Sequence, residues 1–214
     1  MSTRRHSSHD LQYPDPDPDP GADGENQVKE LIAAFRAGDR QAYDRIVERY
    51  RGPVRALAYQ MTHDYDEAAD IAQEVFVKMA KNIDRYDEKR KFYTWLYRIT
   101  VNAAIDHIRR GRRHKHESLD SIPDVEEGPD ANPEMTFLRQ RIQEHIHEAA
   151  NKLNEKQRSA FLLRDVGGRK VDDVAGIMNM PEATVRWYLH RARARIRKEL
   201  LRRCPHLLFL MGIR

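Results

Sequence analysis

The chain has 214 residues, of which 40% are hydrophobic and 34% charged, with a formal net charge of +4. No stretch approaches the roughly 20 apolar residues of a membrane-spanning helix, and the first residues lack the apolar core of a secretory signal. We therefore expect a cytoplasmic protein of one or two domains. The single cysteine, Cys204, excludes an internal disulfide and a cysteine-based zinc site.

The first 26 residues are predicted to form a disordered acidic tail, because residues 14–20 alternate proline with aspartate. From Gln27 onward the apolar spacing is helical and hardly ever strand-like. It predicts four helices that form a first domain over residues 27–112, the second of them bent at Gly52-Pro53. The polar stretch 84–91 reads as a surface loop before the fourth helix, which we expect from about Tyr93 to Arg110.

Residues 113–136 are predicted to be a linker, because they contain three prolines and little apolar periodicity. Within this stretch, residues 117–134 hold seven acidic residues and no base. Helical spacing resumes in a second domain over residues 137–202, and an apolar tail follows over 203–214. The fold class is therefore all-α: two small helical domains joined by a flexible acidic linker.

The second domain contains a helix-turn-helix pattern. Asn154 is a predicted N-cap, and Gly167-Gly168 is predicted to end the helix that begins there. A short helix, 171–178, is followed by Asn179 in the left-handed conformation and by a long helix whose first turn holds Pro181. The long helix is predicted to bury one stripe, made of Val185, Leu189, Ala192, Ile196 and Leu200.

The stripe leaves basic residues on the other faces of the long helix. Arg186, Trp187 and His190 are predicted to meet base edges in the major groove, and the later arginines to hold phosphates. Arg169 and Lys170, before the short helix, are further candidates for phosphate contacts. The alternative interpretation is a solvated, arginine-rich helix in an ordinary bundle.

Aromatic and basic residues alternate over 92–98 in the first domain. Aromatic side chains next to a basic channel are typical of single-strand binding, but aromatics at helical spacing are more often core. From spacing alone, Trp95 is predicted to be buried rather than base-facing.

Together these segments resemble the extracytoplasmic-function sigma factors of bacterial RNA polymerase, in the sigma-70 family. Residues 67–78 look like region 2.2, residues 93–102 with Asp106 and Arg109 look like regions 2.3 and 2.4, and residues 181–186 and 189–193 resemble region 4.2. Ala183 and Trp187-Tyr188 depart from residues frequent in the family, so the −35 sequence cannot be carried over.

The resemblance implies that the first domain is sigma region 2 and the second is sigma region 4. It implies docking on the core polymerase through Asp70, Gln73, Glu74, Phe76 and Lys78. It implies recognition and melting of the −10 element by Phe92, Trp95, Arg98, Asn102, Asp106, Arg109 and Arg110. It implies −35 recognition by the second domain, and together with the residues selected above from the helix-turn-helix pattern the predicted −35 set is Arg169, Lys170, Thr184, Arg186, Trp187, His190, Arg191 and Arg193.

The partners implied are the β′ clamp and β flap of core RNA polymerase, promoter DNA and an anti-sigma factor that holds the protein at the membrane. The loop 83–92 is similar to one that captures a flipped −10 base. The acidic linker is either a solvated tether or a nucleic-acid mimic in the basic channels of the polymerase, and the apolar tail either caps the second domain or binds a partner.

The alternative function is a stand-alone helix-turn-helix regulator that binds duplex DNA without polymerase. A nucleic-acid-processing enzyme is a third class, and the sequence offers no nucleophile motif, phosphate loop or paired carboxylates for it. We expect no enzyme activity, cofactor or metal, because the His114/His116 and His145/His147 pairs diverge at a spacing of two on a helix.

Overall fold

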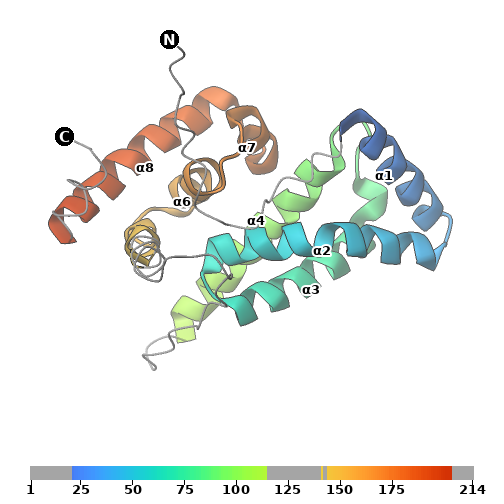
Figure 1. The fold of residues 1–214 in the computed structure, drawn as a ribbon, viewed down its shortest axis with the longest axis horizontal. Coiled ribbons are helices and arrows are strands. Elements are labelled where there is room, and N and C mark those ends of the chain that lie inside the picture. Colours follow the sequence, from blue (N-terminus) through green and yellow to red (C-terminus); the bar gives the residue numbers. More distant parts are fainter. Residues whose placement is uncertain (1–20, 115–140, 142–143, 204–214) are drawn as a thin grey trace, which may run out of the picture.

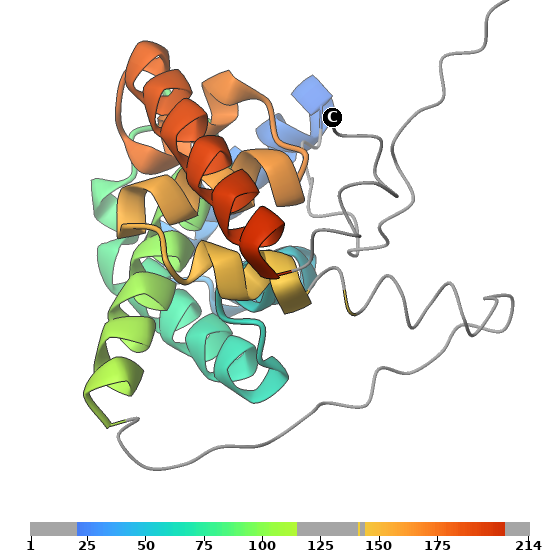
Figure 2. The same ribbon diagram turned by 90° about the vertical axis from the view of Figure 1, so that its left-hand side faces the viewer.

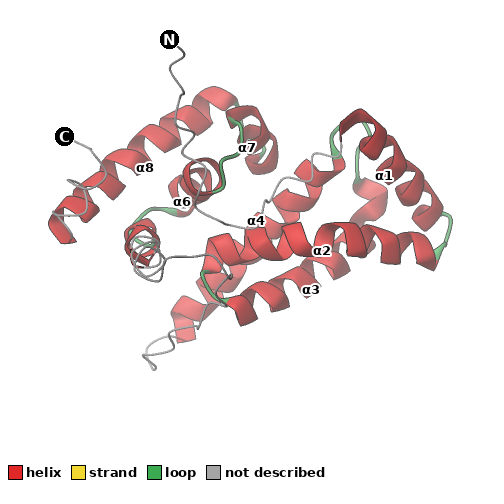
Figure 3. Ribbon diagram, in the orientation of Figure 1, coloured by secondary structure: helices red, strands yellow, loops and turns green. Residues whose placement is uncertain are grey.

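A computed structural model describes residues 21–114, 141 and 144–203 of the chain. Every element in these residues is helical, and they contain no strand (Figure 3). The helices form a first helical unit, residues 21–114, and a second helical unit, residues 144–203. No helix among the described residues is long and apolar enough to cross a membrane. The all-helical fold class is thereby confirmed, whereas most of the predicted linker and both outer tails lie outside the described residues.

The first helical unit contains four α-helices, as predicted. They are α1 (Gly21–Arg36), α2 (Arg40–Thr62), α3 (Tyr65–Asn82) and α4 (Phe92–His114), with a short 3-10 turn, η1 (Ile83–Arg85), after α3 (Figure 1). Asp39 caps α2 by accepting a hydrogen bond from the Gln41 backbone N–H, and Asp64 caps α3 in the same way from Glu67. The helix α2 continues through Pro53.

The start of α1 differs from the prediction. The helix begins at Gly21, inside the stretch expected to be disordered up to residue 26. Residues 21–36 contain no proline, and Val28 of α1 is almost fully buried with Tyr50 and Phe92 beside it. Packing therefore extends the helix over residues that composition alone assigns to the tail.

The core of the first unit follows the predicted stripes. The side chains of Ile46, Leu57, Ile71 and Leu96 are fully buried. The loop between α3 and α4 is exposed over residues 87–91, but Tyr86 turns inward and is 4% exposed. This tyrosine anchors the loop to the body of the unit.

The second helical unit consists of the helical residues 144–150 followed by α6 (Glu155–Phe161), a π-helical turn η2 (Leu162–Val166), α7 (Val171–Met178) and α8 (Glu182–Arg203). Asn154 caps α6 by accepting a hydrogen bond from the Gln157 backbone N–H, as predicted. Asn179 ends α7 with a φ of 51°, which confirms the predicted left-handed turn between the two helices.

The predicted stripe of α8 is confirmed. Val185, Leu189, Ala192 and Ile196 are buried, and Leu200 is partly buried against them. Ala175 of α7 is buried where the two helices meet, which is the close crossing that the small residue predicts. In α7, Ile177 is also buried, although the sequence analysis did not select it.

The two units pack against each other rather than lying apart. Figures 1 and 2 show α7 beside α4, while α8 lies on the outer side of the second unit. Buried side chains of both units form one continuous hydrophobic cluster. The sequence predicted the two units but not this contact.

Candidate nucleic-acid interface

The face of α8 opposite its buried stripe presents an aromatic side chain among cations. Trp187 is 50% exposed, with its ring edge-on to Tyr188 at 5.0 Å between ring centroids. The Arg191 guanidinium lies over the indole, 4.6 Å from its centroid. His190 is exposed on the same helix. These three predicted −35 residues therefore lie exposed on one helix.

An open groove of about 590 Å³ lies between α8 and the start of α7, and four arginines line it: Arg164, Arg186, Arg193 and Arg197. Asp165 holds Arg193 by two hydrogen bonds of 2.6 and 2.8 Å, and it raises the pKa of that guanidinium. Glu182 holds Arg186 at 2.6 Å on the same helix. A phosphate that contacts these two arginines must therefore compete with carboxylates.

The remaining predicted −35 residues lie in different environments. Lys170 is exposed and Thr184 is half-buried at the start of α8. Arg169 is only 6% exposed, and its guanidinium lies 4.5 Å from the ring centroid of Tyr97 in the first unit. In this arrangement Arg169 is a contact between the units and is not presented to DNA.

At the start of α4, the predicted −10 aromatics Phe92 and Trp95 are 3% and 8% exposed. Their rings pack on each other and on Tyr86, and Phe92 also lies edge-on to Tyr50. The burial predicted for Trp95 from spacing is therefore confirmed. Neither ring is available to stack on a base in this arrangement.

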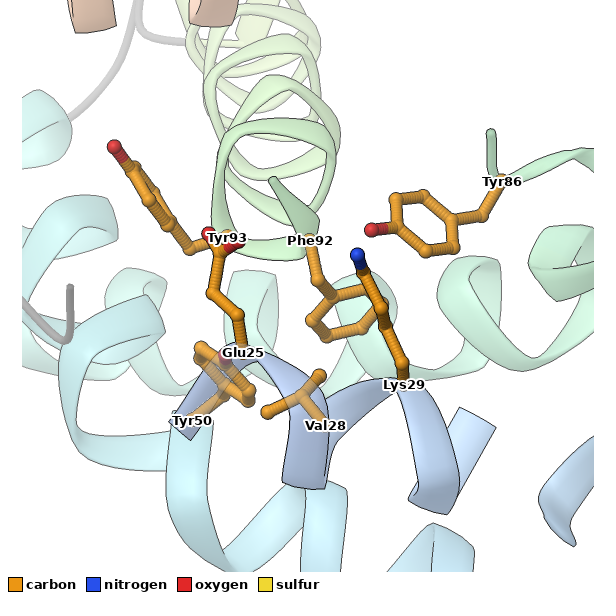
Figure 4. A pocket seen from close by; sticks show the side chains of 7 residues that line it. All are labelled: Glu25, Val28, Lys29, Tyr50, Tyr86, Phe92 and Tyr93. Atoms are coloured by element: carbon orange, nitrogen blue, oxygen red, sulfur yellow. The ribbon is translucent and has the colours of Figure 1, made fainter. Parts of the chain in front are cut away.

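A small cavity lies beside this aromatic cluster. Figure 4 shows Glu25, Val28 and Lys29 of α1 beneath the first turn of α4, with Tyr50, Tyr86, Phe92 and Tyr93 completing the lining. Its volume of about 10 Å³ matches a single water molecule, so the cavity is too small for a flipped base. Burial and the nearby carboxylate of Glu25 raise the pKa of Tyr86 to about 12.

The polar residues of α4 lie further along the helix. Asn102 and Asp106 are exposed and Arg98 is half-buried. Arg110 lies 3.4 Å from Glu74 of α3. Arg109 is 3.7 Å from Asp106 and also donates two hydrogen bonds to the Glu155 carboxylate of α6. One predicted −10 residue is thus held by the other unit.

The predicted polymerase-docking residues lie along α3, but not all on its surface. Asp70 and Gln73 are exposed, whereas Phe76 is 6% exposed and belongs to the core. Glu74 pairs with Lys78 at 2.7 Å, and this hydrogen bond is the main reason that its pKa is lowered. The exposed face of α3 at these residues therefore carries acidic side chains, and Phe76 is packed beneath it.

Polar side chains join the two units at several points. Arg158 of α6 donates a 2.7 Å hydrogen bond to the Met61 carbonyl in the last turn of α2. Asp173 of α7 accepts a hydrogen bond from the Tyr93 hydroxyl. Both contacts are partly or fully buried, where a hydrogen bond left unmade is costly. They fix α6 and α7 against the first unit.

Two glycines set how closely the units approach. A Cβ at Gly176 of α7 would lie 2.8 Å from the Thr94 methyl group of α4, and one at Gly167 would lie 2.7 Å from the Gln60 side chain of α2. Neither glycine needs a positive φ. Their role is therefore the space that they leave between the units.

Two family models match the chain. Sigma-70 region 2 matches residues 46–114, and sigma-70 region 4 matches residues 143–196. The chain is also 35% identical over 184 residues to the RNA polymerase sigma-H factor of Pseudomonas aeruginosa, which covers 82% of this chain and 95% of that protein. The chain belongs to the sigma-70 family, as an ECF sigma factor. The resemblance stated from the sequence is confirmed.

Other relatives of this sigma factor agree with the assignment. The ECF RNA polymerase sigma factor SigW of Bacillus subtilis is 33% identical over 185 residues, covering 82% of this chain and 98% of that one. Two solved structures share the fold. CnrH, solved with the cytosolic domain of CnrY, has a TM-score of 0.57 at 20% identity over 81% of this chain and 96% of that chain. RpoE of Bartonella quintana, solved with the anti-sigma factor NepR, has a TM-score of 0.55 at 21% identity over 74% and 96%.

The sequence did not predict three acidic side chains that bind residues of the candidate site. Glu155, Asp165 and Asp173 engage Arg109, Arg193 and Tyr93, respectively. Their sequence neighbourhoods give no periodic signal, because each pairing joins different elements and two of them join different regions. Among the residues that the structure describes, no group of three or more His, Cys, Asp and Glu side chains is arranged to hold a metal ion.

Proposed function

We propose that this alternative sigma factor reads the −35 element through α8, engages the −10 element through α4 and docks on the β′ clamp of core RNA polymerase through α3. The observation that carries the proposal is the outer face of α8, where exposed Trp187, His190 and Arg191 border an arginine-lined groove. As a sigma factor, the chain supplies recognition, and catalysis belongs to the polymerase.

The exposed residues of α8 fall into two kinds: side chains suited to base edges and side chains suited to phosphates. The Trp187 indole offers an apolar surface for a thymine methyl group, and His190 offers ring nitrogens to base edges. Arg191 stacks on Trp187 and carries a charge suited to a phosphate. The tryptophan therefore supplies sequence discrimination, and the arginine supplies affinity that depends little on sequence.

The burial of Phe92 and Trp95 gives them a supporting role in −10 recognition. Both rings fix Tyr86 and hence the loop between α3 and α4. The exposed Asn102, Asp106, Arg109 and Arg110 then provide the polar surface of α4 that faces DNA. Arg109 must exchange Glu155 for a phosphate, and Arg169 must leave Tyr97, when both regions bind a promoter.

The acidic surface of α3 suits a basic protein surface and repels DNA. Asp70 and Gln73 contact the polymerase directly in this proposal, whereas Phe76 keeps the helix in place. Region 4 meets the β flap. Complementary charge of this kind directs a partner to one face of the molecule.

An anti-sigma factor is a further proposed partner, since CnrH and RpoE, two solved proteins that share this fold, were each captured with a protein bound. The location proposed is cytoplasmic, where the polymerase works, with an anti-sigma factor able to hold the protein at the membrane.

The role of α8 is tested by fluorescence anisotropy of the core-bound protein on promoter DNA. Trp187→Ala is expected to lower the preference for the cognate −35 sequence over a scrambled one by roughly tenfold, within the 1–3 kcal/mol of a base contact. Arg191→Ala is expected to weaken both duplexes alike and to reduce the salt dependence by about one phosphate contact. Lys198→Ala, exposed on the same helix, is the control. Equal loss of preference in all three variants would contradict the proposal.

The role of α3 is tested by binding to core polymerase without DNA. Asp70→Lys reverses an exposed charge on this face, and we expect the affinity for core to fall at least about tenfold. Asp44→Lys makes the same change at an exposed position of α2 and is expected to leave core binding unchanged. Similar affinities for the two variants would refute docking through α3.

A further inference from the structure

A pair of histidines joins the two units at the end of α2. His63 is the C-terminal cap of α2, in the left-handed conformation, and His147 lies in the helical residues 144–150 of the second unit. Their rings stack with 4.3 Å between centroids and 22° between planes. His147 is 4% exposed. The stack therefore joins a buried histidine to a half-buried one, between parts of the chain that are 84 residues apart in sequence.

The histidine pair lacks the hydrogen-bond acceptors that a protonated ring needs. His63 Nδ1 and His147 Nε2 are both buried, and neither has a hydrogen-bond partner among the described residues. An imidazolium must donate from both ring nitrogens, whereas a neutral ring leaves one nitrogen without a proton. The geometry accommodates two neutral rings better than one charged ring.

The surroundings of the pair are mixed in charge. Asp64, at the start of α3, and Glu144, in the second unit, act on His63, and the Tyr59 ring lies 5.4 Å from it. On the other side, Arg158 of α6 acts on His147. His147 also has a hydrogen bond with the backbone of Gln60. His145, on the same helical segment as His147, lies 3.9 Å from Glu148.

We propose that the His63–His147 stack is an acid-sensitive latch: neutral histidines hold regions 2 and 4 together, and protonation separates them. Protonating either ring places a cation face to face with the other ring inside a buried contact. Protonating His147 also sets its charge against Arg158. Separation returns both rings to water and removes this cost. The proposal goes beyond the sigma-factor function, because it concerns the free protein.

The direction of the pH effect on the latch follows from the pKa values of the two histidines when the units are packed. Burial lowers the pKa of His147 most, and His63 and Arg158 lower it further, to about 3. Burial also lowers the pKa of His63, against the opposing effect of Glu144 and Asp64. Both rings return toward a pKa of about 6.5 when the units separate. The latch is therefore fully closed above about pH 6.5 and weakens as the pH falls.

The size of the effect follows from the same values. For His147 alone, a pKa near 3 when packed and near 6.5 when separated lowers the ratio of packed to separated molecules about tenfold between pH 7.5 and pH 5.5. The shift of His63 acts in the same direction. A distance between labels on the two units reports this ratio directly.

The experiment places spin labels at Lys81→Cys on α3 and Lys198→Cys on α8 in a Cys204→Ser background, both positions being exposed. Pulsed electron resonance then gives the fraction of separated molecules in the free full-length protein. We expect the ratio of separated to packed molecules to rise about tenfold from pH 7.5 to pH 5.5. In His147→Phe, which keeps an aromatic ring but cannot take a proton, most of this rise is expected to be lost.

The control is His107→Gln, which removes a half-buried histidine from α4 and should keep the wild-type response. Circular dichroism checks that each variant is folded, and His147→Gln, which also cannot take a proton, replaces His147→Phe should the latter unfold; the outcomes stated for the phenylalanine variant then apply to it. A wild-type distance that is unchanged between pH 7.5 and pH 5.5 overturns the proposal, as does a full response in the phenylalanine variant. An NMR titration that gives His147 an ordinary pKa in the packed protein also overturns it. None of these outcomes depends on polymerase, so a failure here is distinct from a failure of the proposed promoter recognition.

Discussion

At the scale of single residues, the N-cap of α6 stabilises the folded protein through one side-chain hydrogen bond. Asn154 has extended backbone and its side chain accepts a hydrogen bond from the Gln157 N–H at 2.9 Å. Asn154→Ala is expected to lower the free energy of unfolding by about 1 kcal/mol, the usual cost of a lost N-cap. Urea denaturation measures the change, with the exposed Lys156→Ala on the same helix as control. Equal effects of the two substitutions would show that the cap contributes nothing.

The sequence predicted the role of a residue correctly where that role depends on its neighbours along the chain. Asn154 and Asn179 are specified by their position at a helix end, and both behave as predicted. Phe76 and Arg169 are different. The resemblance assigns Phe76 to a docking surface and the position of Arg169 before the short helix predicts a phosphate contact, but both side chains are buried in this chain. Burial depends on which elements meet, and a residue's own neighbours in sequence do not determine that.

At the scale of elements, α8 depends on one stripe of apolar side chains, as its other faces are basic. Ile196 is 5% exposed within that stripe. Ile196→Ala is expected to cost roughly 2–5 kcal/mol through lost burial and the cavity that remains. The neighbouring Arg195→Ala, at an exposed position, is expected to change stability by less than about 0.5 kcal/mol. Thermal unfolding distinguishes the two, and a destabilisation below that of Arg195→Ala would contradict the burial of Ile196.

Helical periodicity predicted nearly every element because 3.6-residue spacing is visible within each segment. It did not predict the early start of α1 or the π-helical turn η2. Both lie against other elements: α1 packs beside the first turn of α4, and η2 ends at Val166, followed by Gly167 close to Gln60 of α2. Element boundaries therefore required the tertiary structure.

At the scale of the whole molecule, the contact between regions 2 and 4 depends on the absence of a side chain at Gly176. An added Cβ there would lie 2.8 Å from the Thr94 methyl group. Gly176→Ala should therefore raise the separated fraction in the label experiment, although alanine itself favours the helix by about 1 kcal/mol. Thr94→Ser removes the opposing methyl group, so the double variant should pack again. A single variant that stays as packed as the wild type would contradict the close contact.

The contact between the regions explains why part of the candidate site could not be predicted from the sequence. The face of α8 was predictable, because its stripe fixes which side is exposed. The engagement of Arg109 by Glu155 and of Arg169 by Tyr97 joins regions separated by the predicted linker. No spacing within either segment encodes such pairs.

The most direct test of the account is run-off transcription with purified core RNA polymerase on the DNA upstream of the gene for this protein. Addition of the protein is expected to produce a defined transcript that core polymerase alone does not make. Asp70→Lys is expected to reduce it, while Asp44→Lys leaves it intact. Tight binding of the protein alone to duplex DNA, with no binding to core polymerase and no transcript, would contradict the account.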